Sequence, residues 1–226
     1  MRQARGFTLI ELAISLAIIA LMLGMLLVPL NAQIDQQRIN DTQKLLATIS
    51  EAIQGFAVAS GRLPCPATAT TDNHTPGAGM ENRAGTVCGI TEGVLPWATL
   101  GMPELDSWGR RFTYRVTPSF ADDPSGGLQS SFLLSDNGNI TITSAGGAVT
   151  IAANVTAVVV SHGKNGNGGY LPSGLRMALG TGDELENADA DASFVSKVPD
   201  PNFDDLLVWV TSSVLKSRMV AANRLP

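Results

Sequence analysis

Residues that usually carry enzyme chemistry are scarce in this chain of 226 residues. It contains two histidines, His74 and His162, and neither stands near a G-x-S-x-G or an H-E-x-x-H pattern. The segment at 161–169, SHGKNGNGG, has a Gly-Lys pair but lacks the G-x-x-x-x-G-K-[ST] spacing of a phosphate-binding loop. We therefore expect neither catalytic residues nor a cofactor, and we interpret 161–169 as a surface turn.

Charged side chains are also few, at 15% of the chain, and the basic ones are the minority, with 15 Lys and Arg against 20 Asp and Glu. Arg110, Arg111 and Arg115 come closest to a basic cluster, on one predicted strand. Nucleic-acid binding depends on clustered Lys and Arg that neutralise phosphates. The composition therefore argues against a nucleic-acid partner.

One long apolar run lies near the N-terminus. Within residues 7–30 only three side chains are polar, namely Thr8, Glu11 and Ser15. A helix of this length rises about 36 Å, enough to cross a hydrocarbon core of roughly 30 Å. Arg2 and Arg5 precede the run without an acidic residue, so the positive-inside rule predicts a cytoplasmic N-terminus and an exported remainder.

Glu11 distinguishes between the roles open to this run. A cleaved secretory signal has an apolar core of about 7 to 15 residues and a small-x-small cleavage site, whereas this run is longer and Leu30-Asn31-Ala32 fits such a site poorly. A plain transmembrane anchor accounts for the run but not for Glu11, because a carboxylate inside a span costs on the order of 3 kcal/mol or more. No Lys, Arg or His lies within the run to pair with it.

The short basic leader of residues 1–6, followed by GFTLIEL at 6–12, resembles the N-terminus of type IV prepilins and of the pseudopilins of type II secretion. In that family a membrane peptidase cuts after the glycine, the new terminal phenylalanine is N-methylated, and a glutamate five residues into the mature chain serves filament assembly. The resemblance implies cleavage between Gly6 and Phe7, methylation of Phe7 and an assembly role for Glu11. It covers residues 1–30.

The same resemblance implies a structural subunit, a minor pilin or a pseudopilin, rather than an enzyme. Its partners are then a prepilin peptidase and N-methyltransferase, other pilin or pseudopilin subunits, and an inner-membrane assembly platform. The subunit first crosses the inner membrane once, with a periplasmic head, and then enters a periplasmic or cell-surface filament. An alternative of a different class is a single-pass anchored binding protein whose head recognises a substrate or DNA and whose anchor never polymerises.

The resemblance and the apolar pattern divide the chain into four parts: a leader at 1–6, a transmembrane and assembly helix at 7–30, an amphipathic stalk helix at 31–61 and a head at 62–226. Apolar residues recur at three- and four-residue spacing from Leu45 to Ala57, and Gly61 and Pro64 predict the end of the helix. Without the leader, the chain has 13 basic and 20 acidic side chains and a net charge of about −7.

The head has the pattern of an antiparallel sheet. Residues 62–109 are rich in Pro, Gly, Thr and Asn and are expected to form a long connection. Asn137-Gly138 predicts a hairpin turn at 135–139. Runs of β-branched and aromatic residues predict strands at 110–116, 130–135, 139–143, 148–152, 155–160 and 205–210, followed by a helix that Ser212 or Ser213 caps. The predicted fold class is α+β, a long N-terminal helix packed on an antiparallel, pilin-like sheet.

The two cysteines, Cys65 and Cys88, both lie in the long connection. They lack the C-x-x-C spacing of a zinc site, and the exported location favours a disulfide between them. The acidic stretch at 183–191 has no D-x-[DN]-x-[DN]-G frame. We interpret it as a solvated loop, with a calcium-binding loop as the alternative, and predict no metal site.

LDSWG at 105–109 resembles the turn that opens the sheet in pseudopilins, with Ser107 where proline is expected. Whatever the family, Asp106 is expected to cap this turn, because a short carboxylate accepts hydrogen bonds from nearby backbone N–H groups. Trp108 is expected to fill the core of the head.

Overall fold

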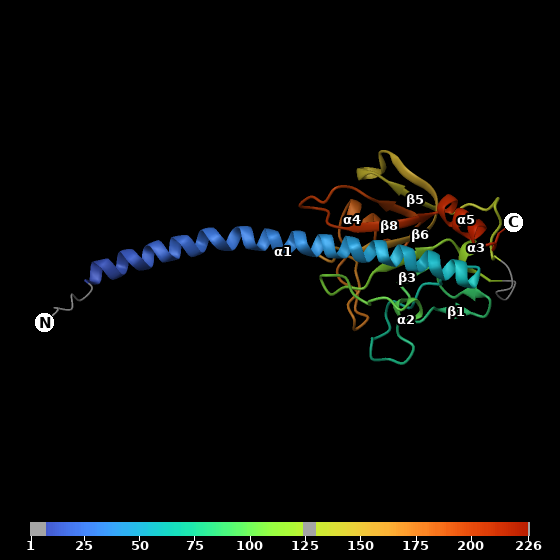
Figure 1. The fold of residues 1–226 in the computed structure, drawn as a ribbon, viewed down its shortest axis with the longest axis horizontal. Coiled ribbons are helices and arrows are strands. Elements are labelled where there is room, and N and C mark those ends of the chain that lie inside the picture. The colour runs from blue at the N-terminus through green and yellow to red at the C-terminus, as the bar shows by residue number, and fades with distance from the viewer. Residues whose placement is uncertain (1–7, 124–129, 226) are drawn as a thin grey trace. The chain divides into compact units, whose positions relative to one another are not determined.

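The computed structural model describes residues 8–123 and 130–225, and the side chains of residues 23–30 lie outside this description. The chain forms two compact units, residues 1–40 and residues 41–226. The described part of the first unit is the N-terminal portion of one long helix. The second unit contains the rest of that helix, the sheet and the remaining helices (Figure 1).

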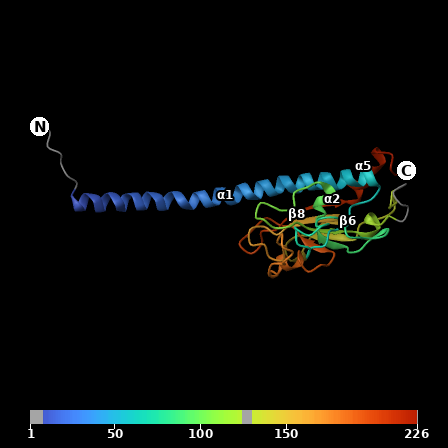
Figure 2. The same ribbon diagram turned by 90° about the horizontal axis from the view of Figure 1, so that it is seen from below.

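Helix α1 runs from Leu9 to Ser60. In the second unit its buried residues recur three or four positions apart, at Leu46, Ile49, Ile53 and Ala57, which confirms the amphipathic pattern of the sequence. Gly61 ends the helix with φ 79°, and its N–H donates to the carbonyl of Ala57 at 2.8 Å. Figure 2 shows this part of α1 lying along one face of the sheet.

A six-stranded sheet forms the body of the head. Its order is β3-β4-β6-β5-β7, with β8 also paired to β6. All pairings are antiparallel except that of β5 with β7. The strands are β3 Glu92–Val94, β4 Thr113–Val116, β5 Ile140–Thr143, β6 Thr150–Ser161, β7 Ser193–Val195 and β8 Leu206–Thr211. The prediction of an α+β fold, a long helix on an antiparallel-rich sheet, is confirmed.

Short elements complete the head. Two two-residue strands, β1 Arg83–Ala84 and β2 Val87–Cys88, form a hairpin inside the long connection. One cluster of buried side chains joins β5, β6 and β7 through Ile140, Ile142, Val155, Val158, Val160 and Phe194. The remaining helices are α2 Trp97–Leu100, α3 Pro118–Ala121, the 3-10 turn η1 Ala145–Gly147, α4 Asp183–Glu186 and α5 Ser212–Ala221.

Several predicted elements are correct and two need correction in their details. The strands predicted at 110–116, 139–143 and 205–210 correspond to β4, β5 and β8, and α5 follows directly. Its cap is Thr211, whose Oγ1 accepts from the N–H of Val214, rather than Ser212 or Ser213. The two strands predicted at 148–152 and 155–160 are one strand, β6, because Asn154 adopts φ 57° and forms a bulge instead of a turn.

The strand predicted at 130–135 is wrong, and so is the hairpin predicted at 135–139. This segment is a turn in which Phe132 is buried while Leu133 and Leu134 are exposed. The ring of Phe132 packs on Phe120, with centroids 4.5 Å apart. The carboxylate of Asp136 accepts the N–H of Leu133 at 2.8 Å, so a local side-chain contact replaces the strand ladder.

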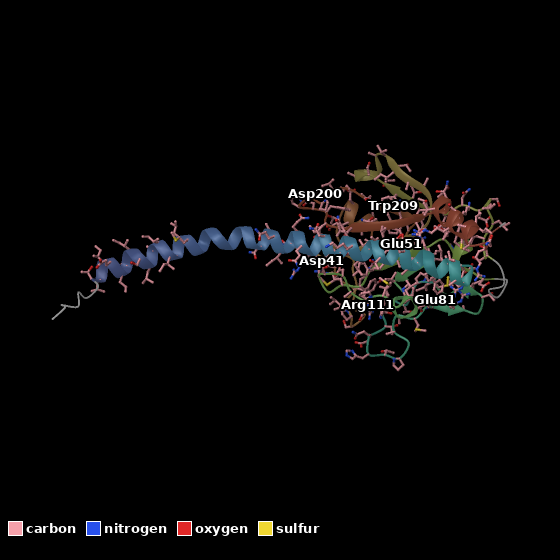
Figure 3. The ribbon with its side chains drawn as sticks, in the orientation of Figure 1. Asp41, Glu51, Glu81, Arg111, Asp200 and Trp209 are labelled. Atoms are coloured by element: carbon pink, nitrogen blue, oxygen red, sulfur yellow. A yellow bond between two sulfur atoms is a disulfide. The ribbon has the colours of Figure 1, made fainter. Side chains whose placement is uncertain are left out.

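The long connection is held by covalent and polar contacts. A disulfide joins Cys65 to Cys88, with Cα atoms 5.4 Å apart, as the sequence predicts. Next to it, the partly buried Glu81 side chain binds the guanidinium of Arg62 at 2.6 Å and the N–H of Cys65 at 2.6 Å. Figure 3 labels Glu81 in this region of the head. These contacts hold separate parts of the long connection together.

Arg111 is completely buried in the head and donates four hydrogen bonds there. Its Nε donates to Glu104 at 2.8 Å, and its guanidinium lies over the ring of Trp97 at 4.7 Å. Its remaining donors bind the carbonyls of Ala69, Thr71 and Pro172 at 2.7 to 2.9 Å. One guanidinium thus ties the long connection to the segment after β6. Figure 3 labels Arg111 in the head.

We predict that Arg111→Met destabilises the head by about 3 to 5 kcal/mol, because it leaves Glu104 and three carbonyls without their donor. The measurement is urea unfolding of the full chain in detergent, followed by tryptophan fluorescence, since all three tryptophans lie in the head. Arg218→Met is the matched control. Arg218 pairs with Glu51 at 2.7 Å in an exposed position, so its loss should have a much smaller effect. Equal effects would contradict the assigned role of Arg111.

Candidate functional site

The first described residues of α1 carry exposed apolar side chains. Between Leu9 and Met22 every large apolar side chain is more than half exposed, and Leu9 reaches 89%. Figure 3 shows these side chains extending on several sides of the helix. Soluble proteins rarely expose a continuous apolar surface of this kind, and such surfaces indicate contact with other proteins or with lipid. The N-terminal portion of α1 is therefore the candidate functional site.

Thr8 and Glu11 form a reciprocal cap at the start of α1. The N–H of Glu11 donates to Thr8 Oγ1 at 3.3 Å, and the N–H of Thr8 donates to Glu11 Oε2 at 3.3 Å. The Thr8 hydroxyl also donates to Glu11 Oε2 at 3.1 Å. This is a capping box, in which a threonine and a glutamate three residues later satisfy each other's backbone donors.

The third polar side chain of the apolar run is also satisfied within the helix. Ser15 Oγ donates to the carbonyl of Glu11 at 2.7 Å. Thr8, Glu11 and Ser15 therefore all find hydrogen-bond partners within one turn of themselves, which lowers the cost of placing them in an apolar environment. The carboxylate of Glu11 also lies at the positive end of the helix dipole, where a negative charge is favoured.

Of the residues predicted for processing and assembly, the structure describes Glu11. Gly6 and Phe7 lie outside the described residues, so their predicted cleavage and methylation remain predictions. The capping role of Glu11 was missed by the sequence prediction. The signal was present, because Thr8 and Glu11 match the T-x-x-E pattern directly before an apolar helix.

Two further predicted features have structural roles in the head. Asp106 caps the LDSWG turn as expected, since its Oδ1 accepts from the N–H groups of Trp108 and Arg110 at 2.9 and 3.0 Å. Its Oδ2 accepts from Ser161 Oγ at 2.6 Å. The indole of Trp108 is only half-buried, so the prediction that it fills the core is corrected.

The acidic stretch at 183–191 is not one uniform solvated loop. Asp183 pairs with Lys197 at 2.9 Å, and this hydrogen bond lowers the pKa of the Asp183 carboxyl below its usual value. Asp189 and Asp191 are exposed. The side chain of Glu184, in contrast, is almost fully buried.

One family comparison gives a match. Residues 1–27 match the family described as the prokaryotic N-terminal methylation motif, which is the leader signature of type IV pilins and pseudopilins. Proteins with this motif are structural, and the motif indicates a chain that is anchored in a membrane before it enters a surface filament. It also implies processing by a prepilin peptidase and assembly with other pilins. Neither a curated protein nor a solved structure matches the chain.

Among the described residues, no helix combines the length and the apolar character needed to cross a membrane.

We predict that Thr8→Ala frays the first turn of α1, because it removes the acceptor for the N–H of Glu11. The expected cost is about 1 kcal/mol of local stability. Amide hydrogen exchange of residues 9–12 in detergent micelles measures it, with faster exchange expected than in the unsubstituted chain. Thr8→Ser keeps the hydroxyl and serves as control. If Thr8→Ala exchanged as slowly as Thr8→Ser, the capping box would not stabilise the helix start.

Proposed function

We propose that this chain, with its prepilin-type leader signature, is a structural subunit of a type IV pilus-like or type II secretion filament, as a minor pilin or a pseudopilin. The observation that carries the proposal is the position of Glu11. It lies at the capped start of an exposed apolar helix, directly inside the matched methylation motif. A carboxylate in the first turn of an apolar helix needs a cationic partner once it leaves water.

Processing supplies that partner. Cleavage after Gly6 would create an amine on Phe7, four residues before Glu11, and this amine remains protonatable after methylation. Within one helix the amine and the carboxylate are about a turn apart. In a bundle of staggered helices, the amine of an incoming subunit can reach the Glu11 of its neighbour.

The capping box leaves room for this charge pairing. In the described structure, the hydrogen bonds to the Glu11 side chain come from Thr8 and converge on Oε2. A carboxylate has about four lone-pair sites on its two oxygens, so Glu11 can hold the cap and accept from a neighbour's amine at the same time. Because an unpaired buried charge is costly, the pairing favours one axial offset between subunits. Glu11 then fixes the register of the filament.

We infer membrane insertion from the apolar run at 7–30, which in the sequence is long enough for a single span with a cytoplasmic N-terminus and which extends beyond the side chains that the structure describes. The head then lies in the periplasm until the subunit enters a periplasmic or cell-surface filament. The partners proposed for this step are a prepilin peptidase and N-methyltransferase, other pilin or pseudopilin subunits and an inner-membrane assembly platform.

The first prediction concerns processing. The chain purified from the membrane of a host with a prepilin peptidase should begin at Phe7 and carry a methyl group on its amine, because Gly6 separates the basic leader from the apolar run. Intact-mass analysis measures both changes at once. Gly6→Val is a suitable control and should keep the leader. A native chain that still begins at Met1 would contradict the processing proposal.

The second prediction separates the charge of Glu11 from its role as a cap. Glu11→Gln keeps an acceptor for the N–H of Thr8, because glutamine also forms capping boxes, but it removes the charge. Thr8→Ala weakens the cap and keeps the charge. We expect Glu11→Gln to reduce incorporation into sheared filaments strongly while membrane insertion stays intact, and Thr8→Ala to incorporate much better.

Quantitative immunoblots of sheared filaments and of the membrane fraction measure the two effects in one culture. Incorporation of Glu11→Gln at the unsubstituted level would contradict the charge-pairing account. Absence of the unsubstituted chain from all filaments, with full retention in the membrane, would instead favour an anchored binding protein that does not polymerise.

A further inference from the structure

Two stretches of strand in the head have an edge that no strand of the described chain pairs with. One is β8, which among the described strands pairs with β6 alone. The other is the first half of β6. Val155 pairs both with Ile140 of β5 and with Thr211 of β8, so β5 and β8 lie on opposite edges of β6. Since β8 ends at Thr211, residues 150–154 have β5 on one edge and no described strand on the other.

Both free edges are uncharged. The sequence of β8 is LLVWVT, without a charged residue or a proline. Around the first half of β6, residues 137–161 contain no Asp, Glu, Lys or Arg. Natural proteins commonly protect an exposed sheet edge with Lys, Pro or a covering element. A free edge without charge is a template for pairing with another strand.

The first half of β6 also presents apolar side chains to solvent. Val149, directly before the strand, is 63% exposed, and Ile151 is 48% exposed. Ala153 is exposed as well, and Ala152 is half-buried. This stretch therefore combines free backbone groups with uncovered apolar side chains, and such surfaces indicate contact with another protein. Figure 1 labels β6 beside β5 and β8.

A groove of about 500 Å³ lies beside the start of β8. Its wall is mainly apolar and includes Leu46, Ala47, Val198, Pro199, Leu206, Leu207 and Val208. Val198 is 84% exposed, although its side chain is large and apolar. A strand added to β8 would point every second side chain to one face of the sheet, so the groove can receive side chains from an incoming strand.

The two edges together indicate a second copy of this chain as the partner. Contact between the β8 edges of two copies would use the same surface twice and close into a dimer. Contact between β8 of one copy and residues 150–154 of the next copy uses two different surfaces. It leaves one edge of each kind free, so it can repeat without closing, as a filament requires.

We propose that β8 of one head pairs with residues 150–154 of β6 in the neighbouring copy, and that the groove beside β8 receives the apolar side chains around Ile151. The proposal rests on the filament function and adds a contact between heads to the contact between helices. Pairing over about five residues is smaller than the roughly 1,200 Å² of a stable interface. It forms where α1 already holds two heads close together, because this raises their effective concentration.

Cross-linking of full chains in sheared filaments tests the contact. One chain carries Val208→Cys on β8, and a second chain with a distinguishing tag carries Ile151→Cys. The native cysteines are joined to each other and do not react with a short bifunctional maleimide. We expect a mixed cross-linked dimer when both variants are produced together, and none when either is produced alone.

A cross-link with either variant alone would show an edge pairing with itself and would overturn the proposal. Leu175→Cys is the matched control, since Leu175 is 64% exposed and belongs to neither edge. It should give no cross-link with Val208→Cys. Filaments that contain both cysteine variants without the mixed cross-link would overturn this contact and leave the filament function standing. Absence of the unsubstituted chain from filaments would overturn both.

A charge on the edge gives a second test. Ile151→Lys should lower incorporation into sheared filaments by roughly fivefold or more, because the contact would bury an unpaired ammonium. The Tm of the head should stay unchanged, since residue 151 is exposed. Ile151→Val keeps a β-branched apolar side chain and should incorporate normally, as should Leu175→Lys. Incorporation of Ile151→Lys at the level of Leu175→Lys would contradict the proposed contact.

Discussion

Burial of one face of α1 against the sheet is the interaction on which the head depends. Leu46, Ile49 and Ile53 are essentially inaccessible, and each buried side chain of this size contributes about 1.5 to 3 kcal/mol. The end of the chain also attaches to this helix, since Arg224 donates to the carbonyls of Val58 and Ala59. Gly61 then turns the chain away at a fixed point, from which the disulfide-bearing connection begins.

The N-terminal part of the same helix differs from the part in the head, because its apolar side chains are exposed rather than buried. Its large apolar side chains from Leu9 to Met22 are exposed, and exposed apolar surfaces of this kind indicate contact with lipid or with other proteins. The polar side chains of this part are bonded to their own helix. One continuous helix thus combines a segment that packs into the head with a segment whose apolar side chains are exposed, which supports the proposed role as a filament subunit.

The sequence predicted those parts of the fold that depend on local periodicity. The long helix, β4, β5, β8 and α5 all follow from apolar spacing, β-branched runs and caps. The errors have local causes that compete with this pattern. A single left-handed Asn154 lets β6 continue where two separate strands were predicted, and the Asp136 side chain replaces a strand ladder at 130–135.

The sequence patterns did not predict the polar contacts between segments that lie far apart in the chain. Arg111 was grouped with Arg110 and Arg115 as the nearest thing to a basic cluster on one predicted strand, yet its partners come from residues 69, 71, 104 and 172. Glu184 likewise meets Asp204 and Asp205 only after folding. No spacing rule applies across such separations. The capping box of Thr8 and Glu11, in contrast, is local. Its T-x-x-E pattern is present in the sequence, although the sequence prediction did not use it.

The free-energy contributions at Glu11 separate its role as a helix cap from the cost of its charge. The capping box requires only an acceptor, which a glutamine also provides. The helix dipole favours the negative charge by about 0.3 to 1 kcal/mol, whereas a carboxylate within an apolar span costs on the order of 3 kcal/mol or more. The cap and the dipole together therefore do not offset the cost of the charge. A carboxylate at this position is favourable only if a cation meets it in the apolar environment, and within the run at 7–30 the sequence offers no Lys, Arg or His for that purpose. This balance supports the proposal that the cation is the amine made by processing, on the same subunit or on a neighbouring one.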